Sequence, residues 1–275
     1  MEDIRKLMEE QDKRIKERMG KIKHKIAVIS GKGGVGKSTV TVNLAMAFAM
    51  KGYSVGILDA DVHGPSVPKM LGLKGRRLQV SEKGEIIPVL GPMNIKVVSM
   101  DFLLPADEAP VVWRGPLKMS AIRQLLGEVD WGELDYLLID LPPGTGDEPL
   151  SIAQLLPDMD GVIIVTIPSE VSEQVVKKSV KFAELLKMRI IGIVENMSYL
   201  SCPKCGERIE VFNGGAGKRI AKSFGIPLLG EIPMDPKIAK EADSGMPFVV
   251  DFSSKTAKAF EEIVSRIEKA LGRVV

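Results

Sequence analysis

Short apolar runs alternate with helical patterns along most of the chain. From Lys25 onward, the runs are rich in Val, Ile and Leu and lack the alternation of a half-exposed strand. Strands that are buried on both faces have this pattern. The predicted strands are 25–30, 54–58, 95–100, 136–140, 161–167, 190–194 and 227–231. The predicted helices between them are 38–51, 116–127, 147–155, 171–187, 214–224 and 254–271. This order predicts an α/β fold with a mainly parallel sheet flanked by helices.

Two segments depart from this alternation. Residues 1–24 are mostly charged or aliphatic and predict a helical arm on the domain edge, with a partner-binding arm as the alternative. Residues 76–93 place apolar runs on both sides of a polar, glycine-containing stretch, which predicts a small inserted β-hairpin. No repeat or low-complexity linker divides the remainder, so we expect one domain over residues 25–275. The apolar stripe of the arm consists of Ile4, Met8, Ile15, Met19 and Ile22.

Composition narrows the class of protein. The 275 residues are 45% hydrophobic and 27% charged, which is a normal balance for a globular domain. A net charge of +2 gives no strong attraction to nucleic acid or to an anionic membrane. Two cysteines make no disulfide framework, and no apolar stretch is long enough to span a bilayer. We therefore expect a cytoplasmic protein without nucleic-acid or membrane partners.

Segment 31–38 reads Gly-Lys-Gly-Gly-Val-Gly-Lys-Ser and lies between the first predicted strand and the first predicted helix. Strand, glycine loop and helix in this order are the context of a phosphate-binding P-loop. Glycines let backbone N–H groups point at phosphate oxygens, and the helix N-terminus adds a partial positive charge. Lys37 is expected to contact the β- and γ-phosphates of ATP, and Ser38 to ligate Mg²⁺. The predicted nucleotide-binding residues of this segment are Gly31, Lys32, Gly33, Gly34, Val35, Gly36, Lys37, Ser38 and Thr39.

Aspartates stand at the ends of two predicted strands. Asp140 ends the run 136–140, where a Walker B carboxylate holds Mg²⁺ or its water beside Ser38. Because ligands bind at the carboxyl ends of strands in open α/β sheets, Asp140 and the P-loop are expected to share one rim. Asp59 and Asp61 follow the second strand and face the same rim. Asp59 is interpreted as support for the Mg²⁺ shell or the P-loop, with a structural hydrogen-bond acceptor as the alternative.

The turn after Asp140 reads Leu-Pro-Pro-Gly-Thr-Gly-Asp and is a candidate switch. The N–H of Gly144 can bind a γ-phosphate and lose it on hydrolysis. The alternative is a rigid surface turn that Asp140 caps.

Cys202 and Cys205 form a Cys-x-x-Cys motif and are the only cysteines of the chain. Two thiolates on one tight loop suit Zn²⁺ or an iron–sulfur cluster, and the spacing alone does not choose between them. The remaining ligands must come from a second chain, from His24 or His63, or from an exogenous thiol. A symmetric homodimer supplies four cysteines by itself. A redox dithiol and a structural zinc knuckle are the competing interpretations.

The glycine loop resembles the deviant Walker A motif of the MinD/ParA/nitrogenase-iron-protein class, which has a lysine directly after its first glycine. The resemblance implies that Lys32 reaches across a homodimer to the partner's nucleotide. It also implies that Asp61 orients the attacking water and that Asn196, at the end of a strand, reads the adenine edge. The alternatives are a solvated surface lysine for Lys32 and a turn-forming asparagine for Asn196.

Taken together, the motifs resemble the Mrp/ApbC/Nbp family of iron–sulfur cluster carrier ATPases over about residues 22–250. The strings that carry the resemblance are GKGGVGKST, LDADVHGPSVP, VVWRGP, LLIDLPPGTGD, VENMSYLSCPKCG and LLGEIPMD. The resemblance implies a homodimer that binds ATP between its subunits, holds a labile [4Fe-4S] cluster on the paired cysteine motifs and passes it to apoproteins. Arg114 belongs to the family pattern without an assigned role.

We accordingly expect slow, Mg²⁺-dependent ATP hydrolysis. The alternatives are a MinD/ParA-like positioning ATPase and a zinc-binding P-loop switch. MinD-type chains end in a basic amphipathic membrane helix, whereas the last predicted helix here mixes acids and bases and is interpreted as a packing helix.

Overall fold

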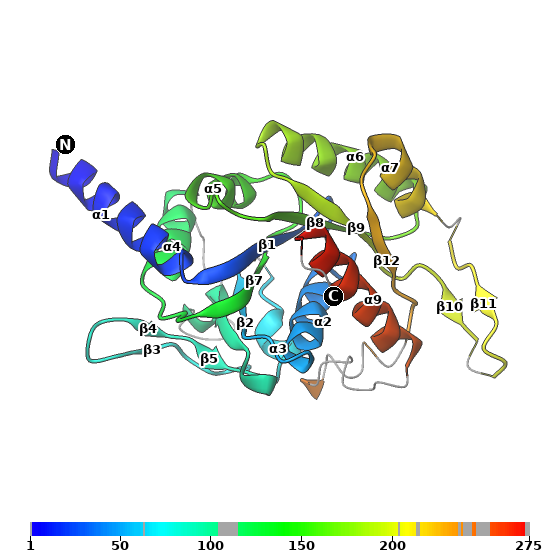
Figure 1. Cartoon of the computed structure of the whole chain (residues 1–275), viewed down its shortest axis with the longest axis horizontal. Helices are drawn as coiled ribbons and strands as arrows, with labels where there is room; N and C mark the ends of the chain where they lie inside the picture. Colours follow the sequence, from blue (N-terminus) through cyan, green and yellow to red (C-terminus); the bar gives the residue numbers. More distant parts are fainter. Residues whose placement is uncertain are drawn as a thin grey trace.

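The computed structural model describes residues 2–62, 64–103, 115–202, 204–212, 215–235, 238, 244–245 and 254–272. A sheet of eight strands in the order β12-β9-β8-β1-β7-β2-β6-β5 forms its centre (Figure 1). The antiparallel pair β5–β6 closes one edge, and the other pairings of this sheet are parallel. The predicted α/β fold is confirmed. The strands are β1 (Ile22–Ser30), β2 (Val55–Asp59), β5 (Val89–Leu90), β6 (Lys96–Ser99), β7 (Leu134–Asp140), β8 (Gly161–Thr166), β9 (Ile190–Glu195) and β12 (Leu228–Glu231).

Helices cover both faces of the sheet (Figure 1). Alternate residues of β1 point to opposite sides: Ile26 and Val28 join the core under one layer, and Ala27 and Ile29 join the core under the other. Burial on both faces explains why the strands read as continuous apolar runs. The first layer contains α2 (Lys37–Met50) and α9 (Lys255–Ala270), and the second contains α4 (Gly115–Gly127), α5 (Asp147–Leu155), α6 (Glu170–Leu185) and α7 (Ala216–Phe224). Shorter helical segments are α3 (Val67–Met70), η1 (Pro92–Asn94) and η2 (Met100–Leu103).

The last helix, α9, buries its apolar face against the body of the protein. Phe260, Ile263 and Ile267 are each at most 1% exposed and join the same core as α2. This is the packing helix that the sequence predicts. No helix among the described residues is long and apolar enough to cross a membrane.

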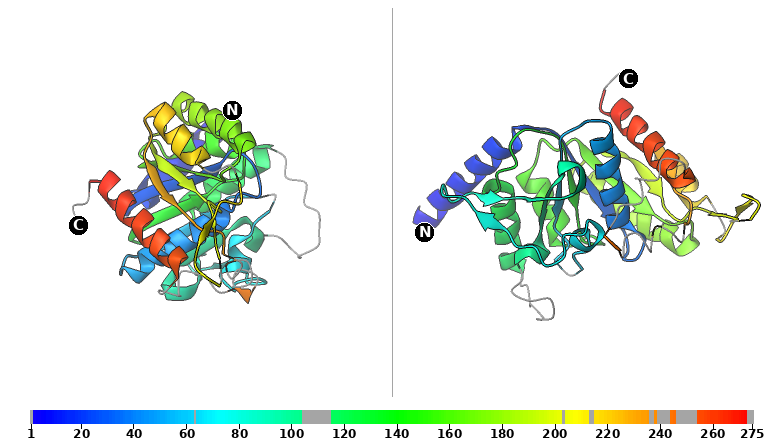
Figure 2. Two further views of the ribbon diagram at one scale, coloured as in Figure 1. Left: turned by 90° about the vertical axis from the view of Figure 1, so that its right-hand side faces the viewer. Right: turned by 90° about the horizontal axis from the view of Figure 1, so that it is seen from below.

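The N-terminal helix α1 (Glu2–Met19) packs by only part of its apolar stripe. Ile15 and Met19 are buried in the core that includes α4, whereas Met8 is 52% exposed. Ile22, which the sequence grouped with the helical arm, is already the first residue of β1. In Figure 2 the free end of α1 lies at one end of the molecule.

Two small hairpins accompany the main sheet. β3 (Gln79–Val80) and β4 (Ile86–Ile87) pair antiparallel and confirm the inserted hairpin. β10 (Leu200–Ser201) and β11 (Arg208–Ile209) form the second hairpin. This second hairpin projects from the end of the molecule opposite to α1 in Figures 1 and 2.

Candidate nucleotide and thiol sites

The glycine loop joins β1 to α2 at the carboxyl end of the strand. Gly34 and Gly36 have φ angles of 77° and 79°, which favour glycine at both positions. A side chain at Gly31 would collide with Val175 on α6, so this position also requires glycine. The loop and the start of α2 line a cavity of about 220 Å³. The predicted residues that line this cavity are Gly33, Gly34, Val35, Gly36, Lys37, Ser38, Thr39 and Asp61.

Three side chains of α2 converge on the carboxylate of Asp140, which is fully buried at the end of β7. The Lys37 ammonium lies 2.8 Å from Oδ2, and the Ser38 hydroxyl donates to the same oxygen at 2.5 Å. Thr41 donates to Oδ1 at 2.7 Å. Lys37, Ser38 and Asp140 are thus brought together as the sequence predicts. Sequence reasoning missed Thr41, although its position four residues after Lys37 puts both on one face of the helix.

Asp59 ends β2 and lies opposite Asp140 in the register of the two strands. It is fully buried, and it accepts hydrogen bonds from the Ser99 hydroxyl at 3.0 Å and from the Asp61 N–H at 3.2 Å. Burial raises the pKa of Asp59 well above its usual value, the Asp140 carboxylate raises it further, and Lys37 opposes the rise. Two neighbouring carboxylates beside the Ser38 hydroxyl are hard oxygen ligands, and this donor set fits Mg²⁺.

Asp61 lines the cavity beside the glycine loop, and Gly144 directly follows Pro143, which also lines it. Asp61 is 8% exposed, lines the cavity and accepts a hydrogen bond from the Gly64 N–H at 3.2 Å. The Gly144 N–H donates to the carbonyl of Ser30 at 2.8 Å. A role of Gly144 in binding a γ-phosphate therefore requires that this backbone bond be exchanged, so its switch role stays a prediction.

Asn196 supports the glycine loop through a side-chain hydrogen bond. Its side-chain amide donates to the carbonyl of Val35 at 2.9 Å, and its own N–H donates to Thr166 at 2.7 Å. The amide packs so closely under Gly36 that a Cβ there would collide with it. Asn196 is 5% exposed. The contact with the loop is a role that the sequence did not indicate, and the contact with adenine stays a prediction.

Lys32 is partly buried at the start of the loop. Its carbonyl accepts a hydrogen bond from the Ser30 hydroxyl at 3.1 Å. Within the described part of the chain, no hydrogen bond or ion pair occupies its ammonium group. Such a side chain is available to a second subunit, but the role of Lys32 across a dimer stays a prediction.

Cys202 and Cys205 lie in the turn between β10 and β11, and both are free thiols. The Cys202 N–H donates to Glu207 at 2.8 Å, and the Cys202 carbonyl accepts from Gly206 at 2.8 Å. Hydrogen bonds from the backbone N–H groups of Cys205 and Lys204 lower the pKa of the Cys202 thiol. A thiolate is the form that binds a metal or a cluster, so this environment favours Cys202 as a metal ligand.

No group of three or more histidine, cysteine or acidic side chains among the described residues is arranged to hold a metal ion. His24 lies in β1, 3.1 Å from Asp160, and stacks on Tyr136. His63, named as another possible ligand, and Arg114 lie outside the described residues. The two thiols therefore stand without a third ligand in the part of the chain that can be described.

The sequence matches the family described as "NUBPL iron-transfer P-loop NTPase", within the ParA group, over residues 21–268. It is 55% identical to the "Iron-sulfur cluster carrier protein" of Saccharolobus solfataricus over 271 residues, which cover 97% of this chain and 91% of that protein. The protein of the same description from Methanocaldococcus jannaschii is 52% identical, with 98% of this chain and 93% of that protein covered.

Solved structures share the fold. The nucleotide-binding protein of Archaeoglobus fulgidus in complex with ADP superposes with a TM-score of 0.76 at 48% identity, covering 85% of this chain and 91% of that one. The cell division ATPase MinD of Pyrococcus furiosus gives a TM-score of 0.64 at 25% identity, covering 90% of this chain and 99% of that one.

Proposed function

The chain belongs to the NUBPL iron-transfer P-loop NTPase family, and from this premise we propose that it is an ATP-hydrolysing carrier of a labile [4Fe-4S] cluster. Two copies of the chain would hold the cluster between them and pass it to apoproteins. The supporting observation is the isolation of Cys202 and Cys205 on a projecting turn. They have no third metal ligand among the described residues, so a second chain is the simplest source of the missing thiolates.

The nucleotide half of the proposal follows from the cavity beside the glycine loop. Lys37, which now pairs with Asp140, would turn to the β- and γ-phosphates, while Ser38, Asp59 and Asp140 would hold Mg²⁺. The bound ion would neutralise charge on the phosphates. Asp61 would orient water, and Lys32 of a second copy would approach the γ-phosphate. Hydrolysis is expected to be slow because few strong bases line this cavity.

The cysteine turn would hold the cluster at an exposed position, from which it can be transferred. Cys202 is partly exposed and Cys205 is exposed, so an acceptor protein can reach both. The lowered pKa of Cys202 favours its thiolate, which is the form that binds iron. The free thiols need a reducing compartment, and the cytoplasm is the one we propose.

Anaerobic reconstitution with iron and sulfide tests this function. We expect the wild type to gain the visible absorption of a [4Fe-4S] cluster, with four iron atoms per two chains, and to elute as a dimer. The Cys202→Ala/Cys205→Ala variant should gain none. His24→Gln serves as the control and should retain the cluster, because the His24 imidazole already contacts the Asp160 carboxylate. A monomer that carries a full cluster, or a cluster on the double variant, would contradict the proposal.

Zinc is a second candidate for the same thiols, because thiolate sites bind Zn²⁺ readily. Metal analysis of the reconstituted protein separates the two: a zinc switch would keep zinc and reject iron and sulfide under anaerobic conditions. A positioning ATPase has less support, because α9 packs its apolar face inside the protein and is not free to lie on a membrane.

A further inference from the structure

A second cavity lies directly beside the cysteine turn. It has a volume of about 510 Å³ and is bounded by the base of the β10–β11 hairpin, α7, β12 and α9. We call it the basic groove. Its described lining contains two carboxylates, Glu231 and Glu262. The cations that line it are Arg208, Lys218, Lys255, Lys258 and Arg266. The described lining therefore carries a clear excess of positive charge.

Carboxylates in the groove already neutralise part of this positive charge. Glu231, only 17% exposed, lies 3.1 Å from the Lys218 ammonium and 3.6 Å from the Arg208 guanidinium. The other carboxylate, Glu262, is 71% exposed and lies 3.9 Å from Arg266. Glu231 is thus shared by two cations. After its charge is neutralised, the groove still carries an excess of positive charge.

The remaining charge faces solvent. Lys258 is exposed, and no described residue gives its ammonium group a hydrogen bond or an ion pair. The Lys218 side chain is 60% exposed despite its pairing with Glu231. An anionic partner would therefore meet accessible ammonium groups without first breaking a buried network.

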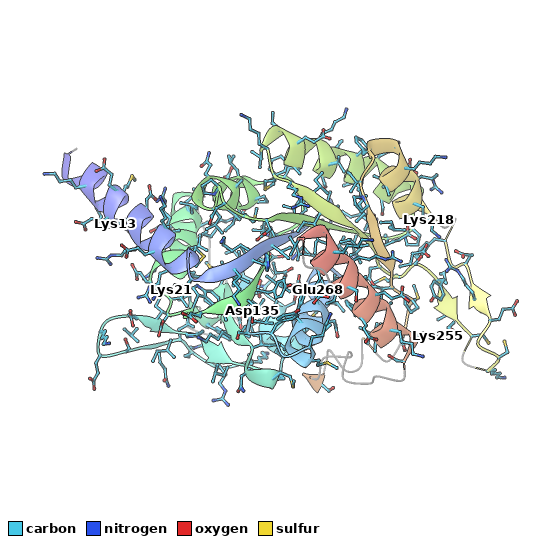
Figure 3. The ribbon with its side chains drawn as sticks, viewed as in Figure 1. Lys13, Lys21, Asp135, Lys218, Lys255 and Glu268 are labelled. Carbon is cyan, nitrogen blue, oxygen red and sulfur yellow. The ribbon has the colours of Figure 1, made fainter. Side chains whose placement is uncertain are left out.

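The basic groove is physically joined to the cysteine turn. The Lys255 ammonium donates to the Ser201 hydroxyl at 2.9 Å and to the Gly206 carbonyl at 3.1 Å. Ser201 and Gly206 flank the Cys-x-x-Cys segment on its two sides. In Figure 3 the labelled Lys218 and Lys255 lie above and below the base of the projecting hairpin. A partner in the groove would therefore sit next to the thiols.

We propose that the basic groove binds an acidic segment of the protein that accepts a cluster from this chain. A nucleic acid fits less well, because the Arg208 guanidinium already covers a face of the Tyr199 ring at 4.0 Å and competes with a base for that face. Glu231 and Glu262 would also repel a continuous phosphate backbone, whereas the spaced carboxylates of a peptide can avoid them.

This inference rests on the proposed function and gives it a docking step. A segment bound in the groove would hold the acceptor's cysteines near Cys202 and Cys205, so that transfer becomes an event within one complex. Exposed charges mainly set the encounter rate and its dependence on salt. The groove should therefore increase the transfer rate without changing how tightly the cluster is held.

Peptide binding tests the groove directly. The probe is a fluorescein-labelled peptide of alternating glutamate and glycine, followed by fluorescence anisotropy with the wild-type protein at low and high salt. We expect salt-sensitive binding, and a loss on the order of tenfold in the Lys218→Gln/Lys258→Glu variant, from the summed effect of exposed pairs. Lys13→Glu, an exposed lysine on α1 at the other end of the molecule in Figure 3, should bind as the wild type does. Unchanged binding by the double variant, equal binding of a lysine–glycine peptide, or tighter binding of oligothymidylate would overturn the proposal.

A transfer assay separates the groove from the proposed function. Reconstituted wild type, Lys218→Gln/Lys258→Glu and Lys13→Glu are mixed with an acidic apo-ferredoxin, and the appearance of its cluster is followed. We expect equal cluster content and ATP turnover in all three, with transfer several-fold slower only in the double variant at low salt. Equal transfer rates would overturn the groove and leave the carrier function intact. A wild type without a cluster would overturn the carrier function, and the peptide titration would then decide the groove alone.

Discussion

The side chains of the candidate nucleotide site converge on the carboxylate of Asp140. One of its oxygens faces both Lys37 and Ser38, and the other faces Thr41. A fully buried carboxylate is stable only with such partners, because removing it from water costs several kcal/mol. The same pairing holds the lysine and the hydroxyl in the lining of the cavity, where a phosphate can compete for them.

Replacement of Lys37 by alanine should weaken ATP binding by about 10- to 100-fold, because a charge-assisted bond to phosphate is lost. Isothermal titration with Mg–ATP measures the effect. Thr41→Val is the matched control: it also removes a donor from Asp140 but no phosphate countercharge. It should lower the melting temperature while leaving ATP affinity within a few-fold of the wild type. ATP affinity that is unchanged in Lys37→Ala would refute the P-loop assignment.

Lys32→Ala and Asp61→Ala should bind ATP and hydrolyse it at least about 100-fold more slowly, the usual effect of losing a group that aligns or stabilises the reacting atoms. Asp61 lines the cavity, and the Lys32 ammonium has no described partner within its own chain. Phosphate release under saturating ATP measures turnover. Asp61→Asn, which keeps an acceptor for the Gly64 N–H, controls for loop collapse. Near-normal turnover by both alanine variants would rule out the sandwich-dimer mechanism.

Sequence reasoning found most of the residues that line the cavity beside the glycine loop, because these residues stand at fixed distances from glycines and strand ends. It missed Thr41, because this threonine lies beyond the glycine-loop motif and only the fold shows that its hydroxyl reaches Asp140. It also could not show that Asn196 supports the loop, since that contact with Val35 joins residues far apart in the chain. Side-chain contacts across elements depend on packing, which a single sequence does not display.

At the scale of elements, continuous apolar runs located the parallel strands because both faces of the sheet are covered. The start of β1 was predicted at Lys25 but lies at Ile22, because Ile22 continues the apolar stripe of the helical arm. Lys25 itself looks like a surface residue. In the fold it is 4% exposed, with its ammonium 3.1 Å from the Ile22 carbonyl and 3.2 Å from Asp158. The two-residue strands β5, β10 and β11 are too short to leave a periodic pattern. β5 pairs with β6 at the edge of the main sheet, and β10 pairs with β11 across the cysteine turn.

An ion pair joins Lys51, which directly follows α2, to Glu268 on α9. The Lys51 ammonium lies 2.5 Å from Oε2 of Glu268, which is 1% exposed, and the Oε1 atom of Glu268 has no partner among the described residues. Lys51→Met should lower the free energy of unfolding by about 2 kcal/mol, because a buried carboxylate loses its cation. Chemical denaturation measures the loss.

Two variants sharpen this comparison. Lys51→Met/Glu268→Met should recover most of the lost stability, because the unpaired charge is removed together with its partner. Lys23→Met breaks a pair with Asp135 of 2.7 Å in which the lysine is 65% exposed, and it should change stability by less than about 1 kcal/mol. Figure 3 marks Glu268 and Asp135. Equal losses in Lys51→Met and Lys23→Met would contradict the argument from burial.

At the scale of the whole molecule, one short segment connects the nucleotide cavity to the thiols. Asn196 holds the glycine loop, and the chain then continues through β10 to Cys202. Between them, Met197 has a φ angle of 52°, an uncommon conformation for a residue other than glycine. The residue that contacts the glycine loop and the cysteine turn are therefore joined by one short stretch of chain, residues 196–202.

The stoichiometry of cluster binding tests whether two chains form the proposed dimer. Each chain has only Cys202 and Cys205, so a cluster with four thiolates needs two intact chains. Wild-type chains are mixed with Cys202→Ala/Cys205→Ala chains before reconstitution, and two affinity tags verify that mixed dimers form. Cluster content should follow the square of the wild-type fraction, so an equal mixture keeps about one quarter of the full content.

If each chain bound a cluster alone, the same mixture would keep about one half of the full content, because every wild-type chain would be loaded whatever its partner. An equal mixture of wild type with Lys13→Glu is the control and should keep all of it, since Lys13 lies on α1, far along the molecule from the cysteine turn. A linear dependence on the wild-type fraction, with mixed dimers present, would show that the partner subunit supplies no cluster ligand. A quadratic dependence would tie cluster binding to dimer formation, so that separation of the subunits would release the cluster to an acceptor.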